Sequence, residues 1–219
     1  MVRQENVEGL KAVEENMSSM SQASAPLKTV PFINSSSYTF WQKLLLCVAG
    51  SVVLTLSAKI IIPCWPVNAT LQNLAVIMLG AIYGRKLATF SVLLYLAEGA
   101  CGLPVFTSTP IQGIGLAYMM GPSAGFLFGF ILMAYAAGLL YENGWGSTLF
   151  KAVILCLIAN LVLYIPGILW LSLCIGPKAA LANATLWIPG FLTKMGLAVA
   201  LFLQLTSLKA RSSTSDILS

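Results

Sequence analysis

The side chains best suited to bind a polar ligand are one acid and one base inside long apolar segments. Glu98 lies in the stretch Ser91–Pro110, an apolar run that breaks into a charge-free segment rich in glycine and proline, and Lys194 lies in a later apolar run. An ionisable group at the centre of a membrane span costs roughly 2.5–3.5 kcal/mol, so it normally faces a protein interior or a wet cavity. The irregular segment cannot face lipid either, because its free backbone groups need partners. These features predict a ligand pocket near one membrane face.

The composition identifies an integral membrane protein and leaves little material for catalysis. Of the 219 residues, 58% are hydrophobic and 9% are charged, whereas soluble domains carry about 25% charged residues. The sequence has no histidine, the commonest metal ligand and general base. Six of the seven acidic residues fall in the N-terminal tail, a short loop or the C-terminus, which leaves Glu98 as the one intramembrane carboxylate. We therefore expect neither enzymatic activity nor a metal site.

Six apolar segments are long enough to cross a membrane, for which about 20 helical residues suffice. We place them at 42–62, 69–84, 86–101, 122–141, 148–174 and 184–207. The Gly84-Arg85-Lys86 turn argues that the second and third are separate helices, and Pro166-Gly167 could bend the fifth. The expected fold is an all-α bundle of six transmembrane helices over residues 41–208. A flexible cytoplasmic tail, 1–40, precedes it, and a cytoplasmic C-terminal tail, 209–219, follows.

The basic residues predict the orientation of the bundle. If both termini are inside, nine of the twelve basic residues lie in inside segments, Lys59 and Lys178 lie outside, and Lys194 lies within a span. The excess of lysine and arginine on cytoplasmic loops favours this orientation. The proline- and glycine-rich loops are then external, and Glu98 and Lys194 lie at similar depth near the outer face. An outward-facing site between them is the expected result.

Other polar side chains could complete the site. Thr70, Gln72 and Asn73 offer hydroxyl and amide groups near the external end of the second segment, or they serve as helix caps and interhelical hydrogen bonds. Asn160 lies deeper, where helix packing is the alternative role.

Aromatic side chains near the outer face could surround the apolar part of a ligand. The candidates are Trp65, Tyr95, Phe106, Tyr118 and Trp187. The two tryptophans could equally belong to the aromatic belt at the membrane interface. Phe106 is better placed, because it lies in the irregular segment itself.

The five cysteines show no Cys-x-x-Cys spacing, and we interpret them as small apolar packing residues. A disulfide among Cys64, Cys101 and Cys174 stays open if all three lie on one side of the membrane.

Five motifs in order resemble the BioY family, the biotin-binding S components of energy-coupling-factor (ECF) transporters. They are Pro66–Gln72, the pair Gly80 and Gly84, Leu94–Phe106, Gly121–Phe130 and Ile188–Lys194. The similarity covers about residues 43–205. It implies a subunit that captures biotin from the external face for uptake, with biotin as ligand and no cofactor. It also implies a multi-pass protein of the bacterial cytoplasmic membrane.

The resemblance further implies partner subunits. The chain has no phosphate-binding loop of its own. In the family a membrane-embedded coupling protein and two ATPase subunits supply the energy, and these are the expected partners besides the lipid bilayer. No nucleic acid is expected.

One position departs from the family pattern. Phe191 stands where the family has an aspartate, three residues before the lysine that here is Lys194. The resemblance therefore carries over carboxylate binding by Lys194, but not the aspartate's role. We expect Glu98 to accept hydrogen bonds from the ureido group of biotin in its place. Glu98 could instead pair with Lys194 or Lys59, or reach external water.

Three other functions compete with biotin binding. An S component for a different vitamin, of the riboflavin or thiamine type, is the main rival because of Phe191. A membrane enzyme acting on lipid would need clustered carboxylates for metal–phosphate chemistry, and a passive channel would need a polar stripe along several helices. The sequence shows neither feature.

Overall fold

The computed structural model describes residues 38–62, 69–111, 113–186 and 188–218. Most of the expected N-terminal tail, together with Cys64, Trp65 and Trp187, lies outside these described residues. The described chain contains, in order, α2 (Phe40–Lys59), β1 (Ile61–Ile62), β2 (Ala69–Thr70), α3 (Gln72–Ala100), α4 (Gly115–Met119), α5 (Ala124–Glu142), α6 (Leu149–Ile175), α7 (Pro177–Leu186) and α8 (Ile188–Leu218). Helix α8 continues through the residues that we expected to form the C-terminal tail.

Four helices, α2, α3, α5 and α6, are long and apolar enough to cross a membrane, and α7 with α8 forms a bent pair that passes as a fifth. The prediction of an all-helical, multi-pass protein is confirmed. The count of six helices is not confirmed, because the described residues form seven, α2 to α8. The predicted segments 69–84 and 86–101 correspond to the two arms of α3, which meet at a break where we predicted a turn. The break lies at Gly84, whose φ of 75° and ψ of 168° are open to glycine and strained for other residues.

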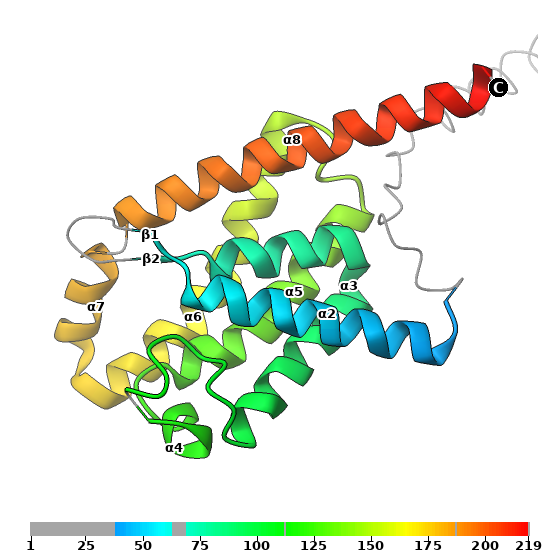
Figure 1. Ribbon diagram of the computed structural model, residues 1–219. Helices are drawn as coiled ribbons and strands as arrows, with labels where there is room; N and C mark the ends of the chain where they lie inside the picture. Colours follow the sequence, from blue (N-terminus) through cyan, green and yellow to red (C-terminus); the bar gives the residue numbers. More distant parts are fainter. Residues whose placement is uncertain (1–37, 63–68, 112, 187, 219) are drawn as a thin grey trace, which may run out of the picture.

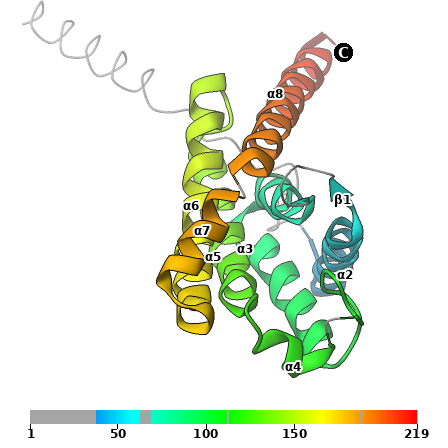
Figure 2. The ribbon, with the colours of Figure 1, turned by 90° about the vertical axis from the view of Figure 1, so that its left-hand side faces the viewer.

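Helices α2, α3, α5 and α6 follow one another across the bundle, with α7 and α8 beside α6 (Figure 2). The packing of α3 against α5 is the most extensive in the molecule, followed by that of α5 against α6. Small residues allow these close approaches. A β-carbon on Gly129 would lie 2.8 Å from the carbonyl oxygen of Leu163, and one on Gly80 would lie 2.9 Å from the backbone nitrogen of Gly138. Backbones without side chains between them gain van der Waals contact, which is the main source of helix association in lipid.

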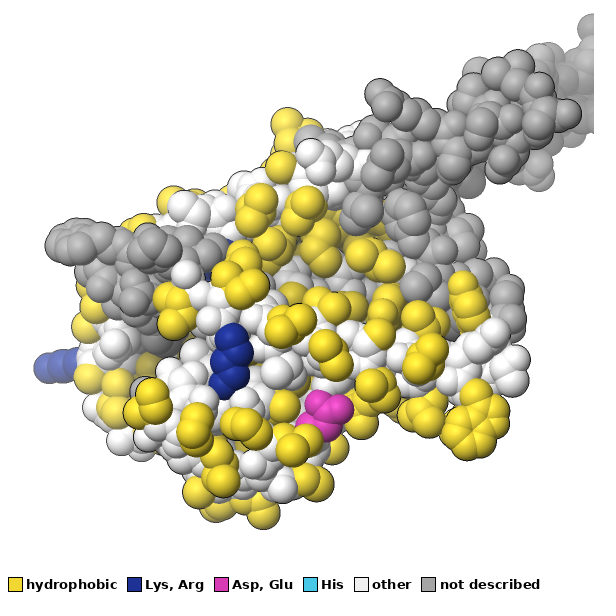
Figure 3. Space-filling model, viewed as in Figure 1, with side chains coloured by type: hydrophobic (Ala, Val, Ile, Leu, Met, Phe, Trp, Pro, Cys, Tyr) yellow, Lys and Arg dark blue, Asp and Glu magenta, His cyan; other side chains and the backbone are white. Residues whose placement is uncertain are grey.

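Helix α2 packs on α3 through a narrow face and leaves the rest of its surface apolar and exposed. Gly50, Ser51 and Ser57 are buried on the packed face, whereas Val52 and Leu56 are exposed. Apolar side chains cover much of this side of the molecule (Figure 3). Such a surface is suited to the acyl chains of a bilayer.

The described segments that border or form the loops expected on the outer side lie together at one end of the bundle. The two short strands, α4 and α7 lie toward the left of Figure 1, whereas the start of α2 and the C-terminal end of α8 lie toward the right. The strands pair antiparallel, with Ile61 opposite Thr70. One end of the bundle is thus built from irregular segments that can enclose a ligand.

The described cysteines are free. Cys47 and Cys156 are buried, in agreement with a packing role, and Cys101 and Cys174 are exposed and not bonded to each other.

Candidate functional site: an aromatic cavity with one cation

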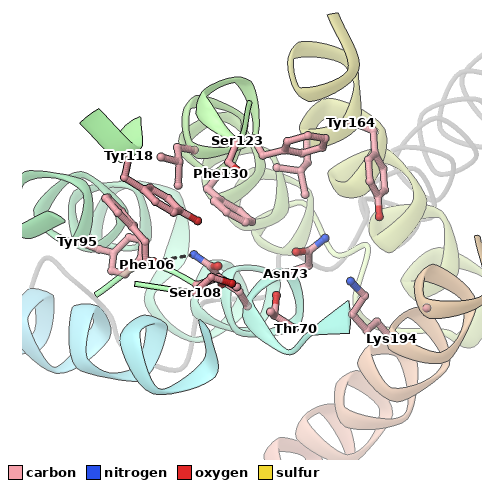
Figure 4. A pocket seen from close by; sticks show the side chains of 16 residues that line it. Thr70, Asn73, Tyr95, Phe106, Ser108, Tyr118, Ser123, Phe130, Tyr164 and Lys194 are labelled. Carbon is pink, nitrogen blue, oxygen red and sulfur yellow. Dashed lines mark hydrogen bonds between the residues drawn. The ribbon is translucent and has the colours of Figure 1, made fainter. Parts of the chain in front are cut away.

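A cavity of about 320 Å³ lies at the loop-rich end of the bundle. Seven residues that the sequence predicted for the site line it: Thr70, Gln72, Asn73, Tyr95, Phe106, Tyr118 and Lys194. They come from β2, both arms of α3, the loop after α3, α4 and α8, so the fold brings together segments far apart in the sequence (Figure 4).

Three aromatic rings form one end of the cavity. The rings of Tyr95 and Phe106 meet edge to face with centroids 5.3 Å apart, and those of Phe106 and Tyr118 stack at 5.0 Å. Such arrangements are favourable beyond the area they bury. Gly99 lies directly against the Phe106 ring, because a β-carbon there would collide with three ring atoms. The spacing of Tyr95 and Gly99, one helical turn apart, therefore makes a flat face on α3 that receives Phe106.

Hydrogen bonds fix this aromatic end from within. The Nε2 of Gln72 donates to the Tyr95 hydroxyl at 3.0 Å, and that hydroxyl donates to the carbonyl of Val105 at 3.3 Å. Gln72 and Tyr95 lie on different arms of α3, so the bond ties the arms together across the break at Gly84. Of the two roles left open for Gln72, the structure shows the hydrogen bond between helical segments.

The hydroxyl of Tyr118 keeps its proton at neutral pH. Burial raises the pKa of Tyr118 above its ordinary value, and an interaction with the Ser123 hydroxyl lowers it by less. A neutral phenol can both donate and accept a hydrogen bond at the cavity wall.

Lys194 provides the charge of the site. It is the one charged side chain among the described residues that line the cavity. It reaches from α8 toward Asn73 and Tyr164, at the end away from the three rings (Figure 4). Beside the low-dielectric protein interior its attraction for a carboxylate is stronger than in water, although desolvation offsets much of the gain. The cavity is therefore suited to a ligand with a ring at one end and an anion at the other.

A loop fastened to α2 covers one side of the cavity. Lys59 Nζ donates to the carbonyl oxygens of Phe106 at 2.8 Å and Thr109 at 2.9 Å, and to the Thr109 hydroxyl at 3.0 Å. The Thr107 hydroxyl donates to the carbonyl of Ala58 at 3.1 Å. Thus the end of α2 positions the segment that carries Phe106 and Ser108 into the wall.

Glu98 lies apart from this cavity, contrary to our expectation. It is not among the lining residues, and its carboxylate accepts a short hydrogen bond from the hydroxyl of Ser51 on α2. With 3.6 residues per turn, Glu98 points about 100° away from Gly99, so it faces α2 while Gly99 faces the Phe106 ring. Lys59, which we considered as its ionic partner, donates to the loop instead.

The other predicted residues lie elsewhere. Asn160 lines a second cavity and not the first, and its Nδ2 donates within α6 to the carbonyl of Cys156 at 2.8 Å. Phe191 lines the same second cavity. Trp65 and Trp187 fall outside the described residues, so their predicted roles are not tested.

Sequence reasoning missed several residues of the wall: Thr107, Ser108, Ser123, Phe126, Leu127, Phe130, Leu163, Tyr164 and Gly190. Phe126 and Phe130 had a detectable signal, since they stand four residues apart, on one face of α5, within a motif already noted. Tyr164 had none, because a tyrosine in an apolar span is ordinary.

An all-α membrane bundle with an aromatic cavity and a single cation defines a binding protein for a small amphipathic anion. The BioY family model matches residues 21–211, and the chain belongs to this family. The resemblance read from the motifs is thereby confirmed.

Relatives and a solved structure agree with this assignment. A probable biotin transporter BioY from Rickettsia prowazekii is 29% identical over 80% of this chain and 89% of its own. Another from Pyrococcus horikoshii is 36% identical over 59% of this chain and 74% of its own. The crystal structure of the S-component for biotin from an ECF-type ABC transporter superposes with a TM-score of 0.64 at 26% identity, covering 78% of this chain and 95% of that one.

Proposed function

We propose that this chain is the biotin-binding subunit of an uptake transporter. The observation that carries the proposal is the cavity itself, which places Lys194 opposite the rings of Tyr95, Phe106 and Tyr118. The names of its relatives support biotin as the ligand. They are transporters, and enzymatic activity forms no part of the proposal.

Biotin has the polarity that this cavity requires. Its bicyclic ring system carries a ureido group with two N–H donors and one carbonyl acceptor, and an aliphatic tail ends in a carboxylate. In our proposal the carboxylate binds Lys194, and the ring system lies against the aromatic end. Apolar pockets with a few placed polar groups are the usual sites for such ligands.

The ureido group needs acceptors, and Phe191 cannot supply them. We propose that the hydroxyl groups of Ser108, Tyr118 and Ser123, which line the aromatic end, take this role in place of a carboxylate. The neutral Tyr118 phenol can also donate to the ureido carbonyl. Neutral acceptors avoid burying a second charge in the cavity, which would be costly without a partner.

The proposed orientation places the loop-rich end outside and both termini in the cytoplasm of a bacterium. The excess of basic residues on the predicted inner segments supports this orientation. We propose that an ECF coupling protein and two ATPase subunits drive release inward. The superposition on an S-component supports such partners.

Direct binding to the detergent-purified protein tests the proposal. Biotin should bind, whereas riboflavin and thiamine should not. Lys194→Met should weaken biotin binding about ten- to a hundredfold, the value expected for loss of a charged hydrogen bond. Lys178→Met is the matched control, because Lys178 is exposed on α7 and outside the cavity lining. Binding of another vitamin without biotin binding would overturn the proposal.

A further inference from the structure

A second cavity, of about 280 Å³, adjoins the first. It lies between α6, α7 and the start of α8, and its wall is apolar apart from Asn160 and the hydroxyl of Tyr164. The Nδ2 of Asn160 already donates within α6. Tyr164 lines both cavities, so its side chain lies at the boundary between them.

Aromatic neighbours on two other helices hold the Tyr164 ring in place. It meets the ring of Phe126 on α5 at a centroid distance of 6.2 Å and 84°, and the ring of Phe191 on α8 at 6.1 Å and 70°. Both are edge-to-face contacts, which favour one ring orientation. The row Phe126, Tyr164 and Phe191 therefore forms a wall that crosses from α5 through α6 to α8.

This wall stands at the charged end of the first cavity. Lys194 follows Phe191 by three residues on α8 and extends toward Tyr164 (Figure 4). A carboxylate bound to Lys194 therefore ends near the wall, and the second cavity lies on its other side. In this direction the Tyr164 ring stands between the carboxylate and the second cavity, so a longer tail would meet it.

We infer that Tyr164, supported by Phe191, limits the length of the ligand's tail and makes the site selective for free biotin over derivatives extended at the carboxyl group. This inference rests on the proposed function and deepens it. Phe191, where the family pattern has an aspartate, thus acquires a role of its own. It buttresses the wall from the side of the second cavity.

Alkyl amides of biotin are suitable probes. The amide carbonyl still accepts a hydrogen bond from Lys194, and an attached alkyl chain suits an apolar cavity. Biotin N-methylamide and biotin N-hexylamide have the same neutral head and differ only in length. The ratio of their dissociation constants therefore reports on length separately from the loss of the carboxylate charge.

The test measures both amides, and biotin, by competition with labelled biotin on the purified full chain. The unaltered protein should bind the methylamide at least tenfold more tightly than the hexylamide. Tyr164→Ala should reduce that ratio at least tenfold by gaining hexylamide affinity. Tyr164→Phe keeps the ring and should keep the ratio. The double variant Tyr164→Ala with Ala184→Phe should restore the ratio, because the added ring fills the second cavity from α7.

A Tyr164→Ala protein that binds biotin but gains no affinity for the hexylamide would overturn the inference. If Tyr164→Ala does not fold, Phe191→Ala provides the same test from α8. An unchanged ratio of dissociation constants in Phe191→Ala would also overturn the inference. Absence of biotin binding by the unaltered protein would instead reject the proposed function.

Discussion

The Nζ of Lys59 lies 2.8 Å from the carbonyl oxygen of Phe106, so a cation at the end of α2 holds the central ring of the cavity's aromatic end. The same amine also donates to the carbonyl and hydroxyl groups of Thr109. The loop between α3 and α4 contains no charged residue of its own. Its attachment to the bundle therefore depends strongly on one side chain from another helix.

Loss of this attachment should speed ligand release. Lys59→Met keeps the aliphatic stem and removes three hydrogen bonds to the loop. We expect about a tenfold loss of biotin affinity, equivalent to about 1.4 kcal/mol. Most of the change should appear in the dissociation rate, because the loop must move for the ligand to leave. Washout of labelled biotin measures that rate.

Lys178→Met again serves as the control and should leave the rate unchanged. An unaltered dissociation rate in Lys59→Met would show that the loop is held by its apolar contacts, chiefly those of Phe106.

Gly99 should be intolerant of a side chain. Gly99→Ala places a methyl group against the Phe106 ring, and overpacking of this kind typically costs about 1–3 kcal/mol. The thermal unfolding midpoint in detergent should fall, and biotin affinity should fall at least tenfold because the ring is displaced.

Gly196→Ala is the matched control for Gly99→Ala. Gly196 also lies within a helix, but a β-carbon there would have no neighbour within 4 Å. Equal effects of the two substitutions would mean that backbone flexibility, and not contact with Phe106, explains the loss.

Glu98 should have little influence on the ligand. In Glu98→Gln the side-chain carbonyl can still accept from Ser51, and the position is outside the cavity wall. We expect biotin affinity to stay within about twofold of the unaltered value, since neutralising a half-buried group outside the cavity wall removes no ligand contact. Equilibrium binding measures this, and a tenfold loss would restore Glu98 as a ligand contact.

The aromatic end of the site could be predicted from sequence because its residues are close together in the chain. Tyr95, Gly99 and Phe106 lie within twelve residues, where helical spacing and the following break fix their relation. The membrane spans were predictable for a similar reason, since length and apolarity are local properties. Lys194 was found because a charge within an apolar run is conspicuous.

Other features depended on which helix lies beside which, and local patterns do not contain that information. The face of α3 that carries Glu98 could have met either the cavity or α2. Only the folded structure shows that it meets α2, where Ser51 contacts Glu98. Tyr164 gains its position from Phe126 and Phe191, which precede and follow it by more than twenty residues. The break at Gly84 is predicted by sequence, because a glycine followed by two basic residues is typical of a turn, but local pattern does not show that both arms belong to one candidate span.

The break at Gly84 is held in place by a side chain from a neighbouring helix. The carboxylate of Glu142 accepts from the backbone nitrogen of Arg85 at 2.9 Å and lies 3.4 Å from its guanidinium Nε. An acid from α5 therefore braces the corner of α3, at the end remote from Gln72 and Tyr95. With the corner held by Glu142 and the two arms tied by the bond from Gln72 to Tyr95, the bend of α3 is fixed from both sides, which keeps the two arms in the relative position that the cavity requires.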